Sequence, residues 1–398
     1  MRIGLFADCY EPTISGVVTS LLQLRRGLER LGHEIVLLVP ETPGYREEDG
    51  AVYRFASLPF NRASGFRFGL VAPRAVQHIV RREKLDIIHT HTEYSLGWAG
   101  KCSAQRLGLP FLHTAHTLHQ AYRHYLPLGK AVPARLVQSY LRLFLSGCDA
   151  LVCPSEKAHN YFKAFVPGVK AVVIGNGVDP TDFRPQCRSQ EQEALTRRAL
   201  GLSPTDQVIL YAGRIAPEKR VVELLEALSL LLQAHPRARL LFVGSGPADQ
   251  DLAVAVERHG LSRQVILVGK VHWPQMHWFY SLAHVFVTAS LSEMQPMTLI
   301  EATLCGLPIV ARRDPAYTGL VRDDENGYLV ASDRELAATA MDLLQDESRR
   351  QRLSENARLL SETFSAKRYA GQLERLYSQV AESKSGLMSP PPPPLPVD

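Results

Sequence analysis

The sequence predicts an α/β protein made of two doubly wound halves, each a parallel sheet with helices on both faces. The 398 residues exceed one ordinary core and fit two domains of roughly 200 residues each. Short apolar segments alternate with longer amphipathic ones throughout, and continuous apolar strands of this kind are typical of parallel sheets buried on both faces. Such folds bind ligands at the carboxyl ends of their strands, so we expect a site in the loops that follow them.

The first half carries six apolar runs separated by helical periodicity. The predicted strands are Ile3–Phe6, Ile35–Val39, Asp86–His89, Pro110–Thr114, Ala150–Cys153 and Ala171–Ile174. The helical segments include Val17–Leu31, Arg74–Lys84 and Ala134–Leu145. A polar stretch at about 176–206 is predicted to join the two halves.

The second half repeats the order. Its predicted strands are Val208–Tyr211, Arg239–Val243, Val265–Val268, Val285–Thr288 and Pro308–Ala311. Its helices include Glu218–Leu232, Asp249–Arg258, Leu299–Leu304 and Glu335–Leu344, followed by helical patterns near 347–362 and 366–382.

Composition is that of a soluble globular protein, with 45% hydrophobic and 21% charged residues. No apolar run approaches the roughly 18 residues that span a bilayer, and the N-terminus is predicted to be a strand and not a signal peptide. The six cysteines lack the CxxC spacing of metal or redox sites, which indicates reduced thiols in a cytoplasmic protein.

Charge is unevenly divided between the halves. Residues 1–175 hold 21 Lys and Arg against 13 Asp and Glu, whereas residues 176–398 hold 24 against 27. The first half is therefore expected to meet an anionic partner, either nucleic acid or a lipid surface.

The segment Ser292–Glu301 contains two glutamates directly after a predicted strand. Their spacing alone means little, because the same interval recurs on exposed helices elsewhere in the chain. Its place is more informative, since Glu293 falls at the carboxyl edge of the sheet and Glu301 in the helix that follows. Carboxylates accept hydrogen bonds from sugar hydroxyls, and the start of that helix offers N–H groups to a phosphate.

The segment Tyr211–Lys219 places two cations at a strand-to-helix turn. Arg214 and Lys219 are suited to a diphosphate, and they would stabilise negative charge on a departing nucleotide. A pair of surface charges is the alternative, with Glu218 neutralising one of them.

Two weaker candidates lie in the first half. Gly16 ends the loop after the first strand, where backbone N–H groups could approach a phosphate, or it merely permits a tight turn. His116 follows the strand at 110–114, where a lone histidine is more often structural than functional.

In this order, the four segments resemble the family-4 retaining glycosyltransferases of the GT-B fold, over Ile3 to about Leu376. The resemblance implies two Rossmann-like domains that face each other across a cleft. Its most specific parts are Gly213–Lys219 and the paired-glutamate segment with the following Gly306–Val310.

The resemblance also implies roles for the catalytic candidates. Arg214 and Lys219 would hold the donor diphosphate. Glu293 would bind hydroxyls of the donor sugar, Glu301 would bind the ribose, and His116 would contact the sugar near its 6-hydroxyl.

Further donor contacts are implied from the backbone. Gly16 would approach the phosphate from across the cleft. Backbone groups near Gly244, Ser245, Lys270 and Val271 would frame the base, and Met297, Thr298 and Leu299 would offer N–H groups to sugar and phosphate.

The implied organisation has four parts. These are an acceptor-side domain at 1–175, a nucleotide-sugar donor domain at 176–365, a helix at 366–385 that crosses back to the first domain, and a Pro-rich disordered tail at 386–398.

Within the family, the likeness is greatest to enzymes that glucosylate diacylglycerol. It is carried by Phe6–Val17, His89–Gly97 and Thr114–Thr117, parts of which related mannosyltransferases share. The chain departs from the commonest pattern after Glu293, where many members have Pro-Phe-Gly and this sequence has Met294-Gln295-Pro296. Sugar specificity is left open by this difference.

A basic and aromatic stretch at 122–145 matches the pattern of a segment that lies in a bilayer interface. Its candidate contacts are Arg123, Tyr125, Lys130, Arg135 and Arg142, and Phe60–Arg67 is a second candidate. The alternative is that Leu136–Leu145 is an ordinary buried helix with exposed arginines. No nucleic-acid-binding module is recognised, so a nucleic-acid partner is not expected.

We therefore expect a retaining enzyme that moves a hexose, glucose from UDP-glucose, to a lipid hydroxyl such as that of diacylglycerol. The nucleotide sugar is a substrate, and neither a cofactor nor a metal is expected, because no Asp-x-Asp pair lies in a suitable loop. Mannosyl or galactosyl transfer to another glycolipid or a soluble acceptor is the alternative, and a non-catalytic nucleotide-sugar-binding protein is a further one. The expected location is cytoplasmic, at the inner face of the cell membrane.

Overall fold

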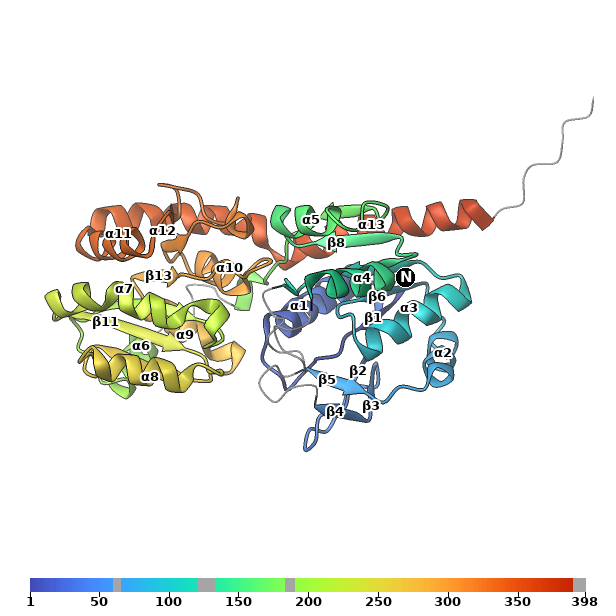
Figure 1. Ribbon diagram of the computed structural model, residues 1–398, viewed down its shortest axis with the longest axis horizontal. Coiled ribbons are helices and arrows are strands. Elements are labelled where there is room, and N and C mark those ends of the chain that lie inside the picture. The colour runs from blue at the N-terminus through green and yellow to red at the C-terminus, as the bar shows by residue number, and fades with distance from the viewer. Residues whose placement is uncertain (60–65, 121–132, 183–189, 389–398) are drawn as a thin grey trace, which may run out of the picture.

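The computed structural model describes residues 1–59, 66–120, 133–182 and 190–388, which form two lobes side by side (Figure 1). The first lobe is built on a parallel sheet in the order β3 (Val52–Phe55), β2 (Glu34–Pro40), β1 (Arg2–Phe6), β6 (Ile87–Thr90), β7 (Phe111–Thr114), β8 (Ala150–Cys153) and β9 (Ala171–Val173). Its helices are α1 (Gly16–Arg30), α2 (Pro73–Arg82), α3 (Ser95–Leu107), α4 (Ala134–Leu145) and α5 (Glu156–Lys163). A small antiparallel ribbon joins β4 (Ser57–Pro59) to β5 (Arg67–Gly69).

The second lobe is built on another parallel sheet. Its strand order is β12 (Val265–Gly269), β11 (Ala238–Val243), β10 (Gln207–Ala212), β13 (Val285–Thr288), β14 (Ile309–Arg312) and β15 (Gly327–Val330). Its helices are α6 (Gln190–Ala199), α7 (Val221–Ala234), α8 (Asp249–Arg258), α9 (Met276–Leu282), α10 (Met297–Leu304), α11 (Asp333–Gln345) and α12 (Glu347–Ser361). Short 3₁₀ turns are η3 (Pro180–Asp182), η5 (Pro217–Lys219), η6 (Trp273–Gln275), η7 (Pro315–Tyr317) and η8 (Glu362–Phe364). The predicted fold class, two doubly wound α/β halves, is confirmed.

Both sheets are buried on both faces, which explains their uninterrupted apolar strands. Successive strand residues point to opposite faces. In β1, Leu5 belongs to one apolar cluster and Phe6 to the cluster on the other side of the sheet. In β10, Ile209 and Leu210 divide in the same way.

Several elements were not predicted. The strands β3 and β15 lie at sheet edges, and β15 starts with a glycine directly after a turn, so neither has a long apolar run. The polar sequence predicts a linker at 176–206, whereas α6 forms within it and packs against α9. In that stretch, residues 176–182 instead bond to α1, for example from the Gln23 amide to the Asp182 carboxylate at 2.9 Å.

The last helix, α13 (Ala366–Met388), belongs to the first lobe and lies against α1 (Figure 1). Tyr377 of this helix is buried, with its hydroxyl 2.7 Å from Nδ1 of His89 in β6. The Lys384 ammonium pairs with Asp149 at 2.8 Å. The helix runs three residues beyond the expected end at 385, so residues 386–388 are helical and not part of the tail, whereas 389–398 lie outside the described residues.

The chain therefore crosses between the lobes at two neighbouring places. Val178, on the way into the second lobe, bridges Ser365, on the way back. Two adjacent crossings are the arrangement expected of a hinge, and in the described part of the chain the backbone hydrogen bonds of Val178 with Phe364 and Ala366 lie at these crossings.

Within the described part of the chain, no helix combines the length and apolar character needed to cross a membrane. The five cysteines described there are free thiols.

We predict opposite effects for two Gly-to-Ala substitutions, one in α1 where it contacts α13 and one on an open side of α13. A Cβ at Gly27 would lie 2.6 Å from Cβ of Ala370, so Gly27→Ala should lower the free energy of unfolding by about 1–3 kcal/mol through overpacking. Gly371, on α13 itself, has nothing within 4 Å of an added Cβ, so Gly371→Ala should raise it by about 0.5–1 kcal/mol through helix propensity. Urea unfolding of both variants checks this, and equal effects would contradict the packing described.

Candidate functional site

A cleft of about 990 Å³ lies between the lobes, at the carboxyl ends of both sheets. All the residues predicted from the sequence for catalysis or donor binding line it. They are Gly16, His116, Arg214, Lys219, Gly244, Ser245, Lys270, Val271, Glu293, Met297, Thr298, Leu299 and Glu301.

The wall after β10 and β11 is formed by two glycines that touch. Gly244 has φ +140°, and a Cβ there would lie 1.8 Å from the carbonyl oxygen of Gly213. Only glycine fits this close approach. It brings the loop carrying Ser245 beside the loop carrying Arg214, whose backbone carbonyl accepts a hydrogen bond from the Tyr211 hydroxyl at 2.9 Å.

Lys219 and Glu293 form an ion pair within the cleft, with Nζ and Oε1 2.6 Å apart. The same carboxylate oxygen accepts a hydrogen bond from the Ser290 hydroxyl at 3.0 Å. The loop is further held by the Ser292 hydroxyl, which donates to the Glu218 backbone carbonyl at 3.0 Å. Because Lys219 and Glu293 neutralise each other, both charged groups can lie largely buried in the cleft, where they are available to a polar ligand.

Glu301 lies deep in α10 with 3% of its surface exposed. Its two carboxylate oxygens accept hydrogen bonds from the Trp273 indole at 2.9 Å and from the Tyr280 hydroxyl at 2.7 Å. Burial raises the pKa of Glu301, and these two bonds oppose the shift. Each oxygen keeps a second lone pair, which can accept a hydroxyl of a ligand.

His116 lies on the opposite wall, with Nε2 3.0 Å from Nδ1 of His91. Burial lowers the pKa of His116 to about 3. The ring is therefore neutral near pH 7 and would serve as a hydrogen-bonding group and not as a cation.

Two helix N-termini meet at the cleft. Gly16 is the first residue of α1, and a Cβ there would touch Cγ of Met297, the first residue of α10, at 3.6 Å. Ser15 caps α1, whereas no side chain among the described residues caps α10. Both ends attract anions through their N–H groups and helix dipoles.

The predicted membrane contacts are only partly described. Arg123, Tyr125 and Lys130 lie outside the described residues, as does most of the second candidate at 60–67. Arg135 and Arg142 are on the exposed side of α4 and do not line the cleft.

Sequence reasoning missed three residues that line the cleft, Trp273, Asn176 and Gln295, and one that contacts its wall from outside, Lys157. Trp273 holds Glu301, and the backbone N–H of Asn176 donates to the Gln295 amide oxygen at 2.6 Å. Lys157 reaches the glutamate-bearing loop from the first lobe. An aromatic residue three positions after Lys270 was a usable signal for Trp273, whereas the others pair with residues far away in the sequence.

Two family models match the two lobes. One, described as Glycosyltransferase Family 4, matches residues 14–182, and the other, Glycosyl transferases group 1, matches residues 192–360. The chain is 30% identical to an alpha-monoglucosyldiacylglycerol synthase of Acholeplasma laidlawii, over 97% of this chain and 98% of that protein. It is a family-4 glycosyltransferase.

Another relative confirms the assignment made from sequence. The enzyme is 32% identical to an alpha-monoglucosyldiacylglycerol synthase of Streptococcus pneumoniae, over 86% of this chain and 78% of that one. Two solved structures share the fold. One is sucrose-phosphate synthase of Thermosynechococcus elongatus, with a TM-score of 0.77, 22% identity, and coverage of 96% of this chain and 99% of that one. The other is Anabaena HepE in complex with UDP and glucose, with a TM-score of 0.75, 20% identity, and coverage of 95% and 100%.

We predict that Lys219→Ala lowers kcat/KM for the sugar donor of this glycosyltransferase by a factor on the order of 100, about 3 kcal/mol, and that Arg214→Ala does the same. Each change removes a cation from the cleft wall where the departing phosphate is expected to lie. Arg220→Ala is the matched control for Lys219, because Arg220 pairs with Asp333 at 2.6 Å and does not line the cleft. Release of nucleoside diphosphate measures the effect, and full activity of both cleft variants would refute the assignment.

Proposed function

We propose that the enzyme moves glucose from UDP-glucose to the free hydroxyl of diacylglycerol, with retention of the anomeric configuration. The observation that carries the proposal is the cleft wall on which Arg214 and Lys219 stand beside Glu293 and Glu301. The similarity to two alpha-monoglucosyldiacylglycerol synthases over most of the chain supports glucose and diacylglycerol as the substrates.

In the proposed complex the donor lies along the wall of the second lobe. The diphosphate is held by Arg214 and Lys219, and its charge is further stabilised by the N-terminus of α10. Glu301 accepts the ribose hydroxyls, and the base lies by Lys270 and Val271, near Ser245. The sugar lies between Glu293 on this wall and neutral His116 on the other, near the start of α1.

The reaction then needs no protein nucleophile. The acceptor oxygen bonds to the anomeric carbon on the face from which the phosphate leaves, while the bond between that carbon and the phosphate oxygen breaks. The acceptor proton passes to the departing β-phosphate, so UDP and the glucoside are the products. Arg214 and Lys219 stabilise the charge that develops on the phosphate, a task for which we propose that no metal ion is required.

A lipid acceptor requires access to a membrane, and α4 supports such a contact. Leu136, Tyr140 and Leu143 recur at intervals of four and three residues, so they lie on one face of the helix. Their exposed fractions are 62%, 39% and 61%. Arg135 and Arg142 flank this stripe and are exposed. The opposite face, with Leu141 and Phe144, packs into the first lobe, so α4 is a buried helix that also presents an apolar outer stripe.

We therefore propose reversible peripheral attachment to an anionic membrane on its cytoplasmic side. Each cation near the surface contributes about 1 kcal/mol, which suits a reversible contact. The first 175 residues hold 21 basic and 13 acidic residues, and this excess of positive charge supports a contact between the first lobe and an anionic membrane.

The substrate prediction is tested by offering UDP-glucose, UDP-galactose and GDP-mannose, each with diacylglycerol in vesicles or with soluble glycerol. We expect an α-glucosyl diacylglycerol from UDP-glucose, and the same rate after treatment with EDTA. A mannosylated or galactosylated product would instead establish the alternative donor. Donor hydrolysis or binding without any transfer would point to a nucleotide-sugar-binding protein.

The membrane prediction concerns the outer stripe of α4. Leu136→Ser combined with Leu143→Ser should weaken binding to vesicles containing phosphatidylglycerol by about tenfold, because apolar area leaves the interface. The matched control changes Leu230 and Leu359, which are 76% and 77% exposed on the second lobe, to serine. Sedimentation with vesicles measures binding, and equal loss in both double variants would rule out α4 as the contact.

A further inference from the structure

The loop that carries Glu293 runs from Ser290 to Pro296, between β13 and α10 of the second lobe. Although it belongs to that lobe, residues of the first lobe and of the crossing segment hold it at three separate points. Binding loops are commonly positioned by a rigid scaffold, and part of the scaffold for this loop belongs to the other lobe.

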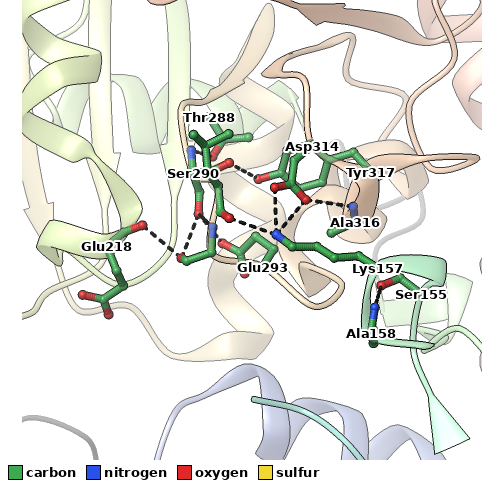
Figure 2. Close-up of polar contacts among 12 residues, drawn as sticks. Ser155, Lys157, Ala158, Glu218, Thr288, Ser290, Glu293, Asp314, Ala316 and Tyr317 are labelled. Atoms are coloured by element: carbon green, nitrogen blue, oxygen red, sulfur yellow. Dashed lines mark hydrogen bonds and ion pairs between the residues drawn. The ribbon is translucent and has the colours of Figure 1, made fainter. Parts of the chain in front are cut away.

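The first and strongest point is Lys157, the second residue of α5 in the first lobe. Its Nζ donates to the backbone carbonyl of Leu291 at 2.9 Å and to both carboxylate oxygens of Asp314 at 2.9 and 2.7 Å. Figure 2 shows the side chain extended from α5 toward this loop and Asp314. The ammonium thus uses all three of its donors on the opposite lobe.

From Lys157 a continuous chain of contacts leads to Glu293. Asp314 accepts a hydrogen bond from the backbone N–H of Ala316 at 2.8 Å and so fixes η7. In that turn, Tyr317 donates from its hydroxyl to the Ser290 carbonyl at 2.7 Å. The Ser290 hydroxyl then donates to the Glu293 carboxylate at 3.0 Å, as Figure 2 shows.

The other two points lie just after the glutamate. Met294 is 4% exposed and packs within the apolar cluster of the first lobe, alongside residues of α4 and α5. Gln295 accepts a hydrogen bond from the backbone N–H of Asn176, in the segment that crosses between the lobes. Both contacts, like those of Lys157, join the loop to residues outside its own lobe, so we expect them to depend on how the lobes are arranged.

Domains joined by a hinge move relative to each other unless a large apolar interface prevents it, and ligands commonly bind as such clefts close. The Lys157–Asp314 pair is shielded, with 16% and 6% of the side chains exposed, so opening the lobes would have to rehydrate both charges. The Lys157 ammonium group therefore links the closure of the two lobes to the position of the loop that carries Glu293.

We propose that Lys157 is a positioning residue for glycosyl transfer. It fixes the Glu293 loop from the opposite lobe, and it does so only when the cleft is closed. The proposal rests on the assignment of Glu293 to the donor sugar. Lys157 itself does not line the cleft, so it is not expected to touch the donor. Its removal should therefore affect the sugar and the transfer step and leave the nucleotide site intact.

The test compares Lys157→Met with Lys384→Met. The two lysines make similar pairs, at 2.7 and 2.8 Å, but Lys384 binds Asp149 within the first lobe. With UDP-glucose and diacylglycerol vesicles, Lys157→Met should lower kcat by about tenfold, as expected for loss of a charge-assisted contact, and Lys384→Met should leave it within about twofold. Affinity for UDP, measured by calorimetry, should stay within about twofold in both. The double variant Lys157→Met/Asp314→Asn, which leaves no unpaired charge, should show the same loss of kcat.

Hydrogen exchange supplies a readout that does not depend on the donor. Backbone amides of residues 290–295 should exchange faster in Lys157→Met than in wild type, and those of Lys384→Met should not change. Unchanged exchange together with unchanged kcat, or an equal loss of UDP affinity and kcat, would overturn the proposal. If wild type transfers no sugar at all, the proposed function fails, and the exchange of this loop still decides whether Lys157 positions it.

Discussion

The direction of the strands is the constraint on which the site depends. In a parallel sheet every strand ends at the same edge, so the loops that follow the strands converge there. Arg214 follows β10, Ser245 follows β11, Lys270 follows β12 and Glu293 follows β13, although they span about 80 residues of sequence. The first lobe presents the corresponding edge of its own sheet to the same cleft, which brings in the start of α1 and His116.

The charged side chains in the cleft are arranged so that they can exchange partners when a ligand binds, and no buried charge is then left without a partner. Lys219 is neutralised by Glu293, whose carboxylate also has the Ser290 hydroxyl. In the proposed complex, a diphosphate would pair with Lys219, and the Glu293 carboxylate would keep the Ser290 hydroxyl and gain hydroxyls of the sugar. Glu301 is held by Trp273 and Tyr280 independently of any cation, so the carboxylate proposed to bind the ribose is fixed before a ligand arrives. Preorganised groups of this kind lose little energy to rearrangement as charge develops.

Sequence reasoning located the strands and the cleft residues because both depend on local patterns. The apolar run that ends before Gly213-Arg214 and the one that precedes Glu293 each indicate a buried strand. The polar residues directly after each run indicate where the strand ends, so a few neighbouring residues are enough for the prediction. Edge strand β15 lacked such a run, and α6 was too polar to be separated from a linker. Contacts such as Lys157 with Asp314 join residues 157 positions apart, and no local pattern encodes which of many lysines will meet which aspartate. The predicted membrane contact of Arg135 and Arg142 stays a prediction for another reason. Exposure on a helix shows that the two side chains can reach a partner, but it does not show whether that partner is a membrane.

The departure from the commonest family pattern after Glu293 has a physical explanation in the lobe contacts. A loop with glycine at this point would be shaped by its own backbone freedom, which is greatest for that residue. Here Met294 instead enters the apolar cluster of the first lobe, and Gln295 accepts a hydrogen bond from the crossing segment. The loop's conformation is thereby determined by side-chain contacts with the other lobe and not by the backbone alone. The position of the Glu293 carboxylate therefore depends on how the two lobes are arranged. If Glu293 binds the donor sugar as proposed, residues 294 and 295 are expected to influence sugar specificity through that arrangement as well as through direct contact with the cleft.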